Sequence, residues 1–151
     1  MSATGLETLE HTLQLTHEWI NELDLRLGWN NKARAFRLLK SVLHALRDCL
    51  IVEEAADFAA QLPMLLRGAY YEQWRPAAVP VKHRKKADFV AHVVASFKPD
   101  PLEHPTQAVM AVFELLNKKI STGEVDDIRL ALPEDLRTIW PERYREPGAV
   151  R

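Results

Sequence analysis

One stretch of the chain occurs twice, seventy positions apart. The first copy, at residues 54–70, reads EAADFAAQLPMLLRGAY, and the second, at residues 124–140, reads EVDDIRLALPEDLRTIW. The residues that recur unchanged are Glu54, Asp57, Leu62, Pro63, Leu66 and Arg67, matched by Glu124, Asp127, Leu132, Pro133, Leu136 and Arg137. A large aromatic residue closes each copy, because Tyr70 is matched by Trp140. We therefore expect the chain to be built from two tandem halves.

The spacing of apolar residues predicts helices throughout. These residues recur at intervals of three and four, and no segment keeps a period of two over the length of a strand. The predicted helices cover residues 6–27, 31–49, 52–61, 106–119 and 133–140, with further helices starting at Pro63 and Ser121 and one containing residues 89–97. We expect an all-α fold, a bundle of about eight helices made of two pseudosymmetric four-helix repeats related by a pseudo-twofold axis.

Local signals place the ends of these helices. Gly28 is expected to end the first helix, and Asn30 to cap the second by accepting a free backbone N–H. Pro63 lacks an N–H and restricts the residue before it, so a corner between two short helices is expected there. The sequence STGE, which begins at Ser121, is a capping box that the first copy lacks at Ile51.

The repeat divides the chain into segments. The first repeat is predicted to cover residues 1–73 and the second residues 85–141, with a Pro-rich and basic linker at 74–84 and a frayed tail at 142–151. A half of about 70 residues rarely buries enough core to be stable alone, so we expect the two repeats to pack as one domain.

Two of the helices carry a clear apolar face. The helix at 31–49 separates apolar from polar residues cleanly, so it is expected to pack by one side. The apolar stripe of the helix at 6–27 is formed by Leu6, Leu9, Leu13, Ile20, Leu23 and Leu27.

Composition excludes several classes of protein. At 151 residues and 47% hydrophobic content, the chain can bury a substantial core without disulfides. A net charge of −1 argues against broad attraction to nucleic acid or to anionic membranes. No apolar run approaches the roughly 20 residues that span a bilayer, and the first residues lack the pattern of a secretory signal. Because Cys49 is the only cysteine, we predict a cytoplasmic protein.

The polar residues shared by both copies are the first candidate site. They are Glu54, Asp57 and Arg67 in the first copy and Glu124, Asp127 and Arg137 in the second. The two acids of each copy are three positions apart and share a helix face, so the copies can form related polar sites that meet between the repeats. In the alternative interpretation, the arginine of each copy pairs with the aspartate and ties the corner together. We favour this structural role, because both halves must solve the same folding problem.

A basic run follows the linker. It consists of Lys82, Arg84, Lys85 and Lys86, with several aromatic residues shortly before it. Basic groups bind phosphates and aromatic rings stack on bases, which makes this the best hint of nucleic-acid binding. The run is short and the chain as a whole is slightly negative, so we interpret it as a solvated linker and do not expect nucleic acid as a partner.

Histidine, cysteine and tryptophan give weaker signals. Three acid–histidine pairs have the i, i+4 spacing that offers two metal ligands, namely Glu7–His11, Asp88–His92 and His44–Asp48. No third ligand is evident, so we expect solvated histidines and no metal. Cys49 is matched by Lys119 and is expected to be an inert thiol near the surface. Trp19 and Trp29 are expected either to pack in the core or to line a small-molecule cavity.

Two stretches carry a resemblance to a known family. They are HALRDCLIVEEAADFAAQLPMLLRGAYYEQW and the weaker echo LLNKKISTGEVDDIRLALPEDLRTIW. Both resemble the bacterial domain-of-unknown-function family 2267, and the resemblance extends from about Thr12 to Trp140. It implies an all-helical bacterial protein with tandem repeats. It brings no activity, substrate, cofactor or catalytic residue.

No motif of a known enzyme class stands out. A Gly-rich phosphate loop, a GxSxG motif and a paired-cysteine metal motif are all missing from the sequence. We therefore favour a non-enzymatic interaction or scaffold protein that binds a protein partner, or a second copy of itself, through exposed helix faces. The alternative is a small-ligand or metal-binding protein with its site at the seam between the repeats.

Overall fold

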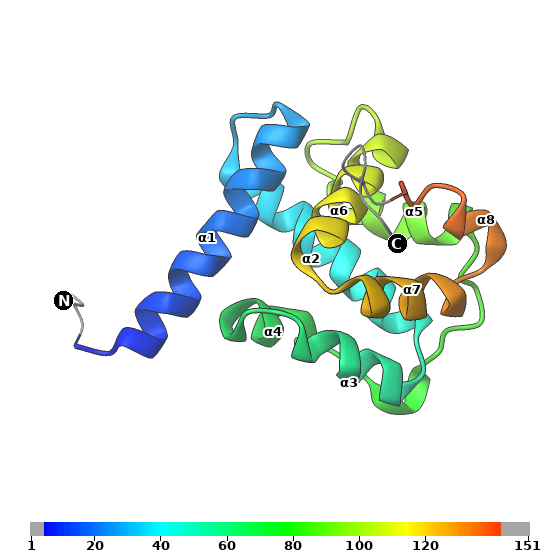
Figure 1. The fold of residues 1–151 in the computed structure, drawn as a ribbon. Helices are drawn as coiled ribbons and strands as arrows, with labels where there is room; N and C mark the ends of the chain where they lie inside the picture. The colour runs from blue at the N-terminus through cyan, green and yellow to red at the C-terminus, as the bar shows by residue number, and fades with distance from the viewer. Residues whose placement is uncertain (1–4, 143–151) are drawn as a thin grey trace, which may run out of the picture.

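The computed structural model describes residues 5–142, which form helices joined by short connections (Figure 1). The elements are α1 Glu7–Leu27, α2 Lys32–Cys49, α3 Val52–Ala60, α4 Met64–Tyr71, the short 3-10 helix η1 Pro76–Ala78, α5 Lys86–Ala95, α6 Pro105–Lys119, α7 Thr122–Ala131 and α8 Glu134–Arg137. The predicted all-α class is confirmed. Within the described residues, no helix is long and apolar enough to cross a membrane. The predicted tail at 142–151 lies outside them from residue 143 on.

Helix α2 runs through the middle of the fold. It contacts α1, α4, α5 and α6, so the expectation that this helix packs by one side is wrong. Ser41 and Arg47, on the side predicted to be polar, are both buried. They can be buried because neighbouring elements supply hydrogen-bond partners. The hydroxyl of Ser41, for example, lies 2.8 Å from that of Ser96 just after α5.

Most helix ends lie within a residue of their predicted positions. Gly28 ends α1 in the left-handed region, with φ of 67°, where glycine carries no steric penalty. The cap of α2 is Asn31 rather than Asn30, because the Asn31 side chain accepts the Arg34 N–H at 3.1 Å. Ser121 caps the first turn of α7, as predicted.

Helix α1 is packed against the rest of the fold along only part of its length. Its C-terminal half contacts α2 and α6, where Glu22 pairs with Lys118 at 2.9 Å and with Lys119 at 2.7 Å. Its first turns extend away from the other helices (Figure 1), and α4 contacts α1 at Thr12, which is buried. Leu9 and Leu13, which belong to the predicted packing stripe, are therefore about half exposed.

Both prolines of the repeated stretch form corners between short helices. Pro63 and Pro133 are the N-caps of α4 and α8, one position before the helix rather than inside it. The start of α4 is capped from another helix, since the Thr12 hydroxyl of α1 accepts the Leu65 N–H at 3.0 Å. Helix α8 ends at Arg137 and is shorter than the predicted segment at 133–140.

One connected cluster of buried apolar side chains includes residues from all eight α-helices. Tyr70 packs edge-to-face on Phe58 with ring centroids 5.4 Å apart, and Trp140 stacks on Phe113 at 4.1 Å. The aromatic residues that close the two copies of the repeat thus both lie in this core. The division into two repeats and their pseudo-twofold relation stay predictions from the sequence.

Candidate functional site

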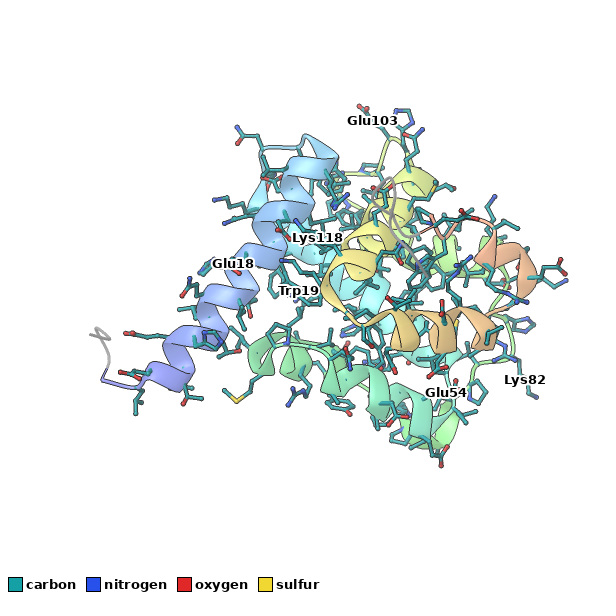
Figure 2. All side chains as sticks on the ribbon, viewed as in Figure 1. Glu18, Trp19, Glu54, Lys82, Glu103 and Lys118 are labelled. Carbon is teal, nitrogen blue, oxygen red and sulfur yellow. The ribbon has the colours of Figure 1, made fainter. Side chains whose placement is uncertain are left out.

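The four acids shared by the two copies line one groove, which we call the acidic groove. Glu54 and Asp57 come from α3, Glu124 and Asp127 come from α7, and the two helices pack against each other. The spacing of three within each pair places both carboxylates on one face of their helix. The groove has a volume of about 430 Å³. In Figure 2, Glu54 lies on the side of α3 that faces α7.

A pair of hydrogen bonds holds one end of this groove together. Gln61, the C-cap of α3, accepts the backbone N–H of Ser121 at 3.2 Å. The Ser121 hydroxyl accepts the N–H of Glu124 at 3.2 Å. The end of α3 is therefore next to the start of α7, and the helices run antiparallel. The predicted capping box is only half formed, because the Ser121 N–H goes to Gln61 while the Glu124 carboxylate lines the groove.

Negative charges accumulate in the acidic groove. Glu54 and Glu124 are half-buried, whereas Asp57 and Asp127 are exposed. Burial raises the pKa of Glu124, and the charges of Asp57, Asp127 and Glu54 raise it further. Among residues 5–142, no three His, Cys, Asp or Glu side chains are arranged so that they could hold a metal ion. The groove can therefore attract a positively charged group, but its geometry is not that of a metal site.

The arginines of the repeat do not pair with the aspartates, which corrects the structural interpretation. Arg67 donates from Nε to the Ala59 carbonyl and from Nη2 to the Leu62 carbonyl, both at 2.8 Å. These carbonyls lie at the end of α3, where the chain turns at Pro63. The Ala59 carbonyl also accepts the Leu62 N–H at 3.1 Å, so Arg67 adds a second donor to it. Arg137 ends α8, and its buried Nε finds no hydrogen-bond partner within residues 5–142. The corner at Pro63 is thus held by an arginine bound to backbone.

The basic run is partly used inside the fold. Arg84 donates to the Cys49 carbonyl at the end of α2 at 3.0 Å. Lys85 is the N-cap of α5, and the Lys86 N–H donates to Asp135 at 3.0 Å. Lys82 is exposed, and Figure 2 shows it at the edge of the molecule. The run therefore positions the start of α5 rather than forming one continuous basic surface.

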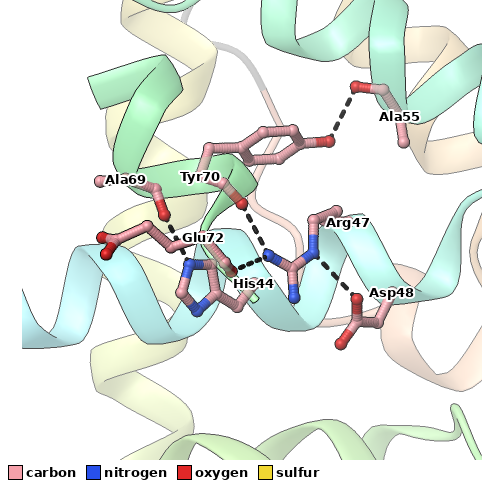
Figure 3. A network of polar contacts seen from close by, with 7 residues as sticks. All are labelled: His44, Arg47, Asp48, Ala55, Ala69, Tyr70 and Glu72. Carbon is pink, nitrogen blue, oxygen red and sulfur yellow. Dashed lines mark hydrogen bonds and ion pairs between the residues drawn. The ribbon is translucent and has the colours of Figure 1, made fainter. Parts of the chain in front are cut away.

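A buried polar network on α2 was not predicted from the sequence (Figure 3). The guanidinium of Arg47, only 4% exposed, donates from Nη1 to the carbonyls of Tyr70 at 2.7 Å and Glu72 at 2.8 Å. Its Nε donates to the neighbouring aspartate at 2.9 Å. His44 Nε2 lies 2.7 Å from the Ala69 carbonyl. Two side chains of α2 thus bind carbonyls at the end of α4, where the helix supplies few further backbone donors; the Ala69 carbonyl also accepts the Glu72 N–H at 3.3 Å.

The repeat itself contains the signal that could have identified this network. Position 117 is the counterpart of position 47, and both residues are polar although most of their helix neighbours are apolar. Asn117 accepts the indole N–H of Trp140 at 2.8 Å and donates to the Pro141 carbonyl at 2.7 Å. A buried polar residue therefore binds the backbone just after the corner in both halves.

Cys49 and His44 are less exposed than the sequence suggested. Cys49 is buried, so its predicted place near the surface is wrong, and burial raises the pKa of its thiol to about 12. The lysine at the matching position, Lys119, did not indicate a surface position for Cys49. The Lys119 side chain is itself largely covered, and its ammonium group pairs with Glu22. His44 is half-buried rather than solvated, and burial lowers the pKa of its ring.

The two tryptophans proposed for a cavity lie in different surroundings. Trp19 is buried in the core. Trp29 lines a surface pocket of about 500 Å³ between the end of α1 and the start of α6. The guanidinium of Arg34 fills part of this region, since it lies over the Trp29 ring and donates to Asp100 at 2.9 Å. Trp29 therefore borders a pocket, whereas Trp19 packs in the core.

Comparison with known proteins gives a family and no activity. The model of a family described as "Uncharacterized conserved protein (DUF2267)" matches residues 16–139. No curated protein matches the chain. The family match takes in most of α1, both Pro corners and the acidic groove. The chain therefore belongs to the family of uncharacterized conserved proteins DUF2267.

Proposed function

We propose that this protein is a non-enzymatic, cytoplasmic interaction protein that binds a partner through one exposed apolar surface. Among residues 5–142, five of the nine exposed large hydrophobic side chains belong to two adjoining segments, the first half of α1 and the first turn of α4. They are Leu6, Leu9, Leu13, Met64 and Leu65. We call them the α1–α4 apolar face. Single exposed leucines are common on soluble proteins, whereas a group of this kind marks a contact surface.

This concentration of apolar side chains carries the proposal, and the hydrogen bond of Thr12 to the backbone of Leu65 supports it. That bond fixes the first turn of α4 against α1, next to Leu9 and Leu13 on the adjoining turns. The apolar side chains of the two helices are therefore presented together on a rigid support. A preformed apolar surface loses little conformational entropy when a partner binds.

The test compares two variants in the cells that produce the protein. Leu9→Gln with Leu13→Gln removes apolar contacts from the α1–α4 apolar face, while Leu25→Gln with Leu130→Gln changes two exposed leucines elsewhere. After cross-linking in cells, the first variant should lose proteins that the natural chain and the second variant both retain. Identical sets of cross-linked proteins for all three chains would refute an interaction through this surface.

A second candidate function is the binding of a small cationic ligand in the acidic groove. Its support is the repulsion among the four carboxylates, which raises the pKa of Glu124 and which a bound cation would relieve. A ligand that binds only the folded protein raises its melting temperature. Spermidine, a flexible polyamine, is a suitable probe. A stabilisation that Glu124→Gln with Asp127→Asn does not reduce would place the ligand elsewhere, and no stabilisation at all would count against this function.

A further inference from the structure

The apolar stripe of α1 has one spacing but two environments. From Leu9 onward, residues 9, 13, 16, 20, 23 and 27 follow one another at intervals of four and three. In the second half of the helix, Leu23 is fully buried and Thr16 is 4% exposed, because α2, α4 and α6 cover them. In the first half, Leu9 is 50% exposed and Leu13 is 47% exposed. The stripe therefore continues past the point where the other helices within residues 5–142 cover it.

The charges on α1 distinguish between the possible partners that could pack on the exposed first half of the stripe. The first 25 residues contain no lysine or arginine, and the first basic residue of α1 is Arg26. The acids over the same stretch are Glu7, Glu10, Glu18, Glu22 and Asp24. The nearest cation of α4, Arg67, donates to two backbone carbonyls of the corner. Glu22 is paired with Lys118 and Lys119, and Asp24 is buried. The α1–α4 apolar face thus lies on a helix that carries acids, but no lysine or arginine, before Arg26.

A second copy of the chain would bring another acidic α1 to this surface. Like charges across a contact are unfavourable, whereas opposite charges steer association and fix its register. The charge pattern therefore favours a partner that combines apolar side chains with lysine or arginine. From Leu6 to Leu13 the axis of α1 rises about 10 Å, which is two turns of a helix. A helical partner of similar length can place anchors at i, i+3 or i+4, and i+7 against it.

We propose that the α1–α4 apolar face is the docking site for a basic amphipathic α-helix of another protein. The apolar side of that helix packs on Leu9, Leu13 and Leu65, and its flanking lysines or arginines lie near the acids of α1. This inference rests on the proposed function, because it assigns the chemistry of the partner at the same surface. It also explains why the first half of α1 has an apolar face directed away from the core.

The test uses synthetic helical peptides of about 14 residues, or roughly 20 Å, measured by fluorescence anisotropy. One peptide carries leucines at helical spacing with lysines on the other face, a second has glutamates in place of the lysines, and a third has the lysine composition with its leucines scrambled. The intact chain should bind the first peptide at least about tenfold more tightly than either of the others, a difference of about 1.4 kcal/mol. Equal binding of the lysine and glutamate peptides would overturn the assignment of a basic partner.

Variants of the chain then locate the site. Leu9→Gln with Leu13→Gln should weaken binding of the lysine peptide at least about tenfold, whereas Leu25→Gln with Leu130→Gln should leave it within about twofold. Unchanged binding by the first variant would overturn the location. Sedimentation of the chain alone tests the remaining possibility, which is that a second copy of the chain occupies the surface. A dimer that Leu9→Gln with Leu13→Gln converts to a monomer would overturn the basic helix and assign the surface to a second copy.

The two levels of the proposal can fail separately. If the cross-linked partners are lost with Leu9→Gln and Leu13→Gln but no lysine peptide binds, the interaction function stands and the basic helix is rejected. If the cross-linked partners are unaffected while the lysine peptide binds at Leu9 and Leu13, the peptide site exists but is not the surface used in cells.

Discussion

Arg47 gives the sharpest test of how the fold is held together. Its guanidinium, 4% exposed, binds two carbonyls at and just after the end of α4 and the side chain of Asp48. Replacing Arg47 with methionine keeps most of the side-chain volume and removes all three hydrogen bonds. We expect the variant to fold and to be clearly less stable.

The size of the loss follows from the groups left without a partner. An unsatisfied buried polar group costs about 1–3 kcal/mol. The carbonyl of Tyr70 is buried and loses its bond, while Glu72 is exposed, so water can replace part of the second bond. The carboxylate of Asp48 is 27% exposed and loses little when its partner is removed. We therefore expect a fall of about 2–4 kcal/mol in the free energy of unfolding.

Urea denaturation followed by tryptophan fluorescence measures this free energy. The midpoint should fall while the slope of the transition stays the same, because the surface exposed on unfolding is unchanged. A loss of about 3 kcal/mol corresponds to roughly 6–12 °C in Tm for a chain of this length. Arg37→Met is the matched control, since Arg37 is an exposed arginine of the same helix. A loss below about 1 kcal/mol for Arg47→Met, or an equal loss in the control, would refute the reasoning.

Three further predictions concern the corner, the α1–α6 contact and the acidic groove. Arg67→Met leaves the Leu62 carbonyl without its side-chain donor and removes one of two donors from the Ala59 carbonyl, so the free energy of unfolding should fall by about 1–3 kcal/mol in urea titrations, and an unchanged midpoint would reject this role. For Glu22, burial alone raises the pKa, but the hydrogen bonds and charges of Lys119 and Lys118 outweigh it and lower the pKa. Its stabilisation is therefore present above the pKa of the unfolded chain and lost as the pH falls through the lowered pKa, so Glu22→Gln should cost about 0.5–1 kcal/mol at neutral pH and nothing at acid pH. The pKa of Glu124 is raised, so its contribution to stability has the opposite pH dependence. That contribution is present below the pKa of the unfolded chain and is lost as the pH rises through the pKa of the folded chain. Glu124→Gln should therefore raise Tm at neutral pH and leave it unchanged near pH 4, and a lower Tm at neutral pH would contradict this.

Much of the helical framework is readable from the sequence. Helix ends depend on local chemistry, so Gly28 and Ser121 could be assigned from neighbouring residues alone. The corners at Pro63 and Pro133 follow from the missing N–H of proline in the same way. The acids that meet in the acidic groove were named because they recur in both copies of the repeat. Their meeting in one groove was a hypothesis, because spacing within a helix does not say which other helix lies opposite.

The environment of α2 could not be read in this way. Helical periodicity tells which side chains share a face, but not how many other helices surround that face. Arg47 and His44 fall on the polar side by spacing, yet Arg47 is buried and His44 is half-buried, because the end of α4 presents carbonyls to them. A long polar side chain with a hydrogen-bond donor at its tip can either point into solvent or bind the carbonyls at a buried helix end. Only the tertiary arrangement decides between the two.

For helix α1, the sequence pattern predicts more burial than the structure shows. Its leucine stripe predicts burial along the whole helix, yet Leu9 and Leu13 are about half exposed on either side of the buried Thr12, whose hydroxyl binds the start of α4. Leu23 and Leu9 occupy the same stripe and differ only in whether another helix of the chain reaches them. A sequence that keeps a packing stripe beyond its own core specifies a contact that the core does not complete. The exposed half of the stripe is the surface for which we propose a partner, and the acids of α1 are the reason for the proposal that this partner is basic.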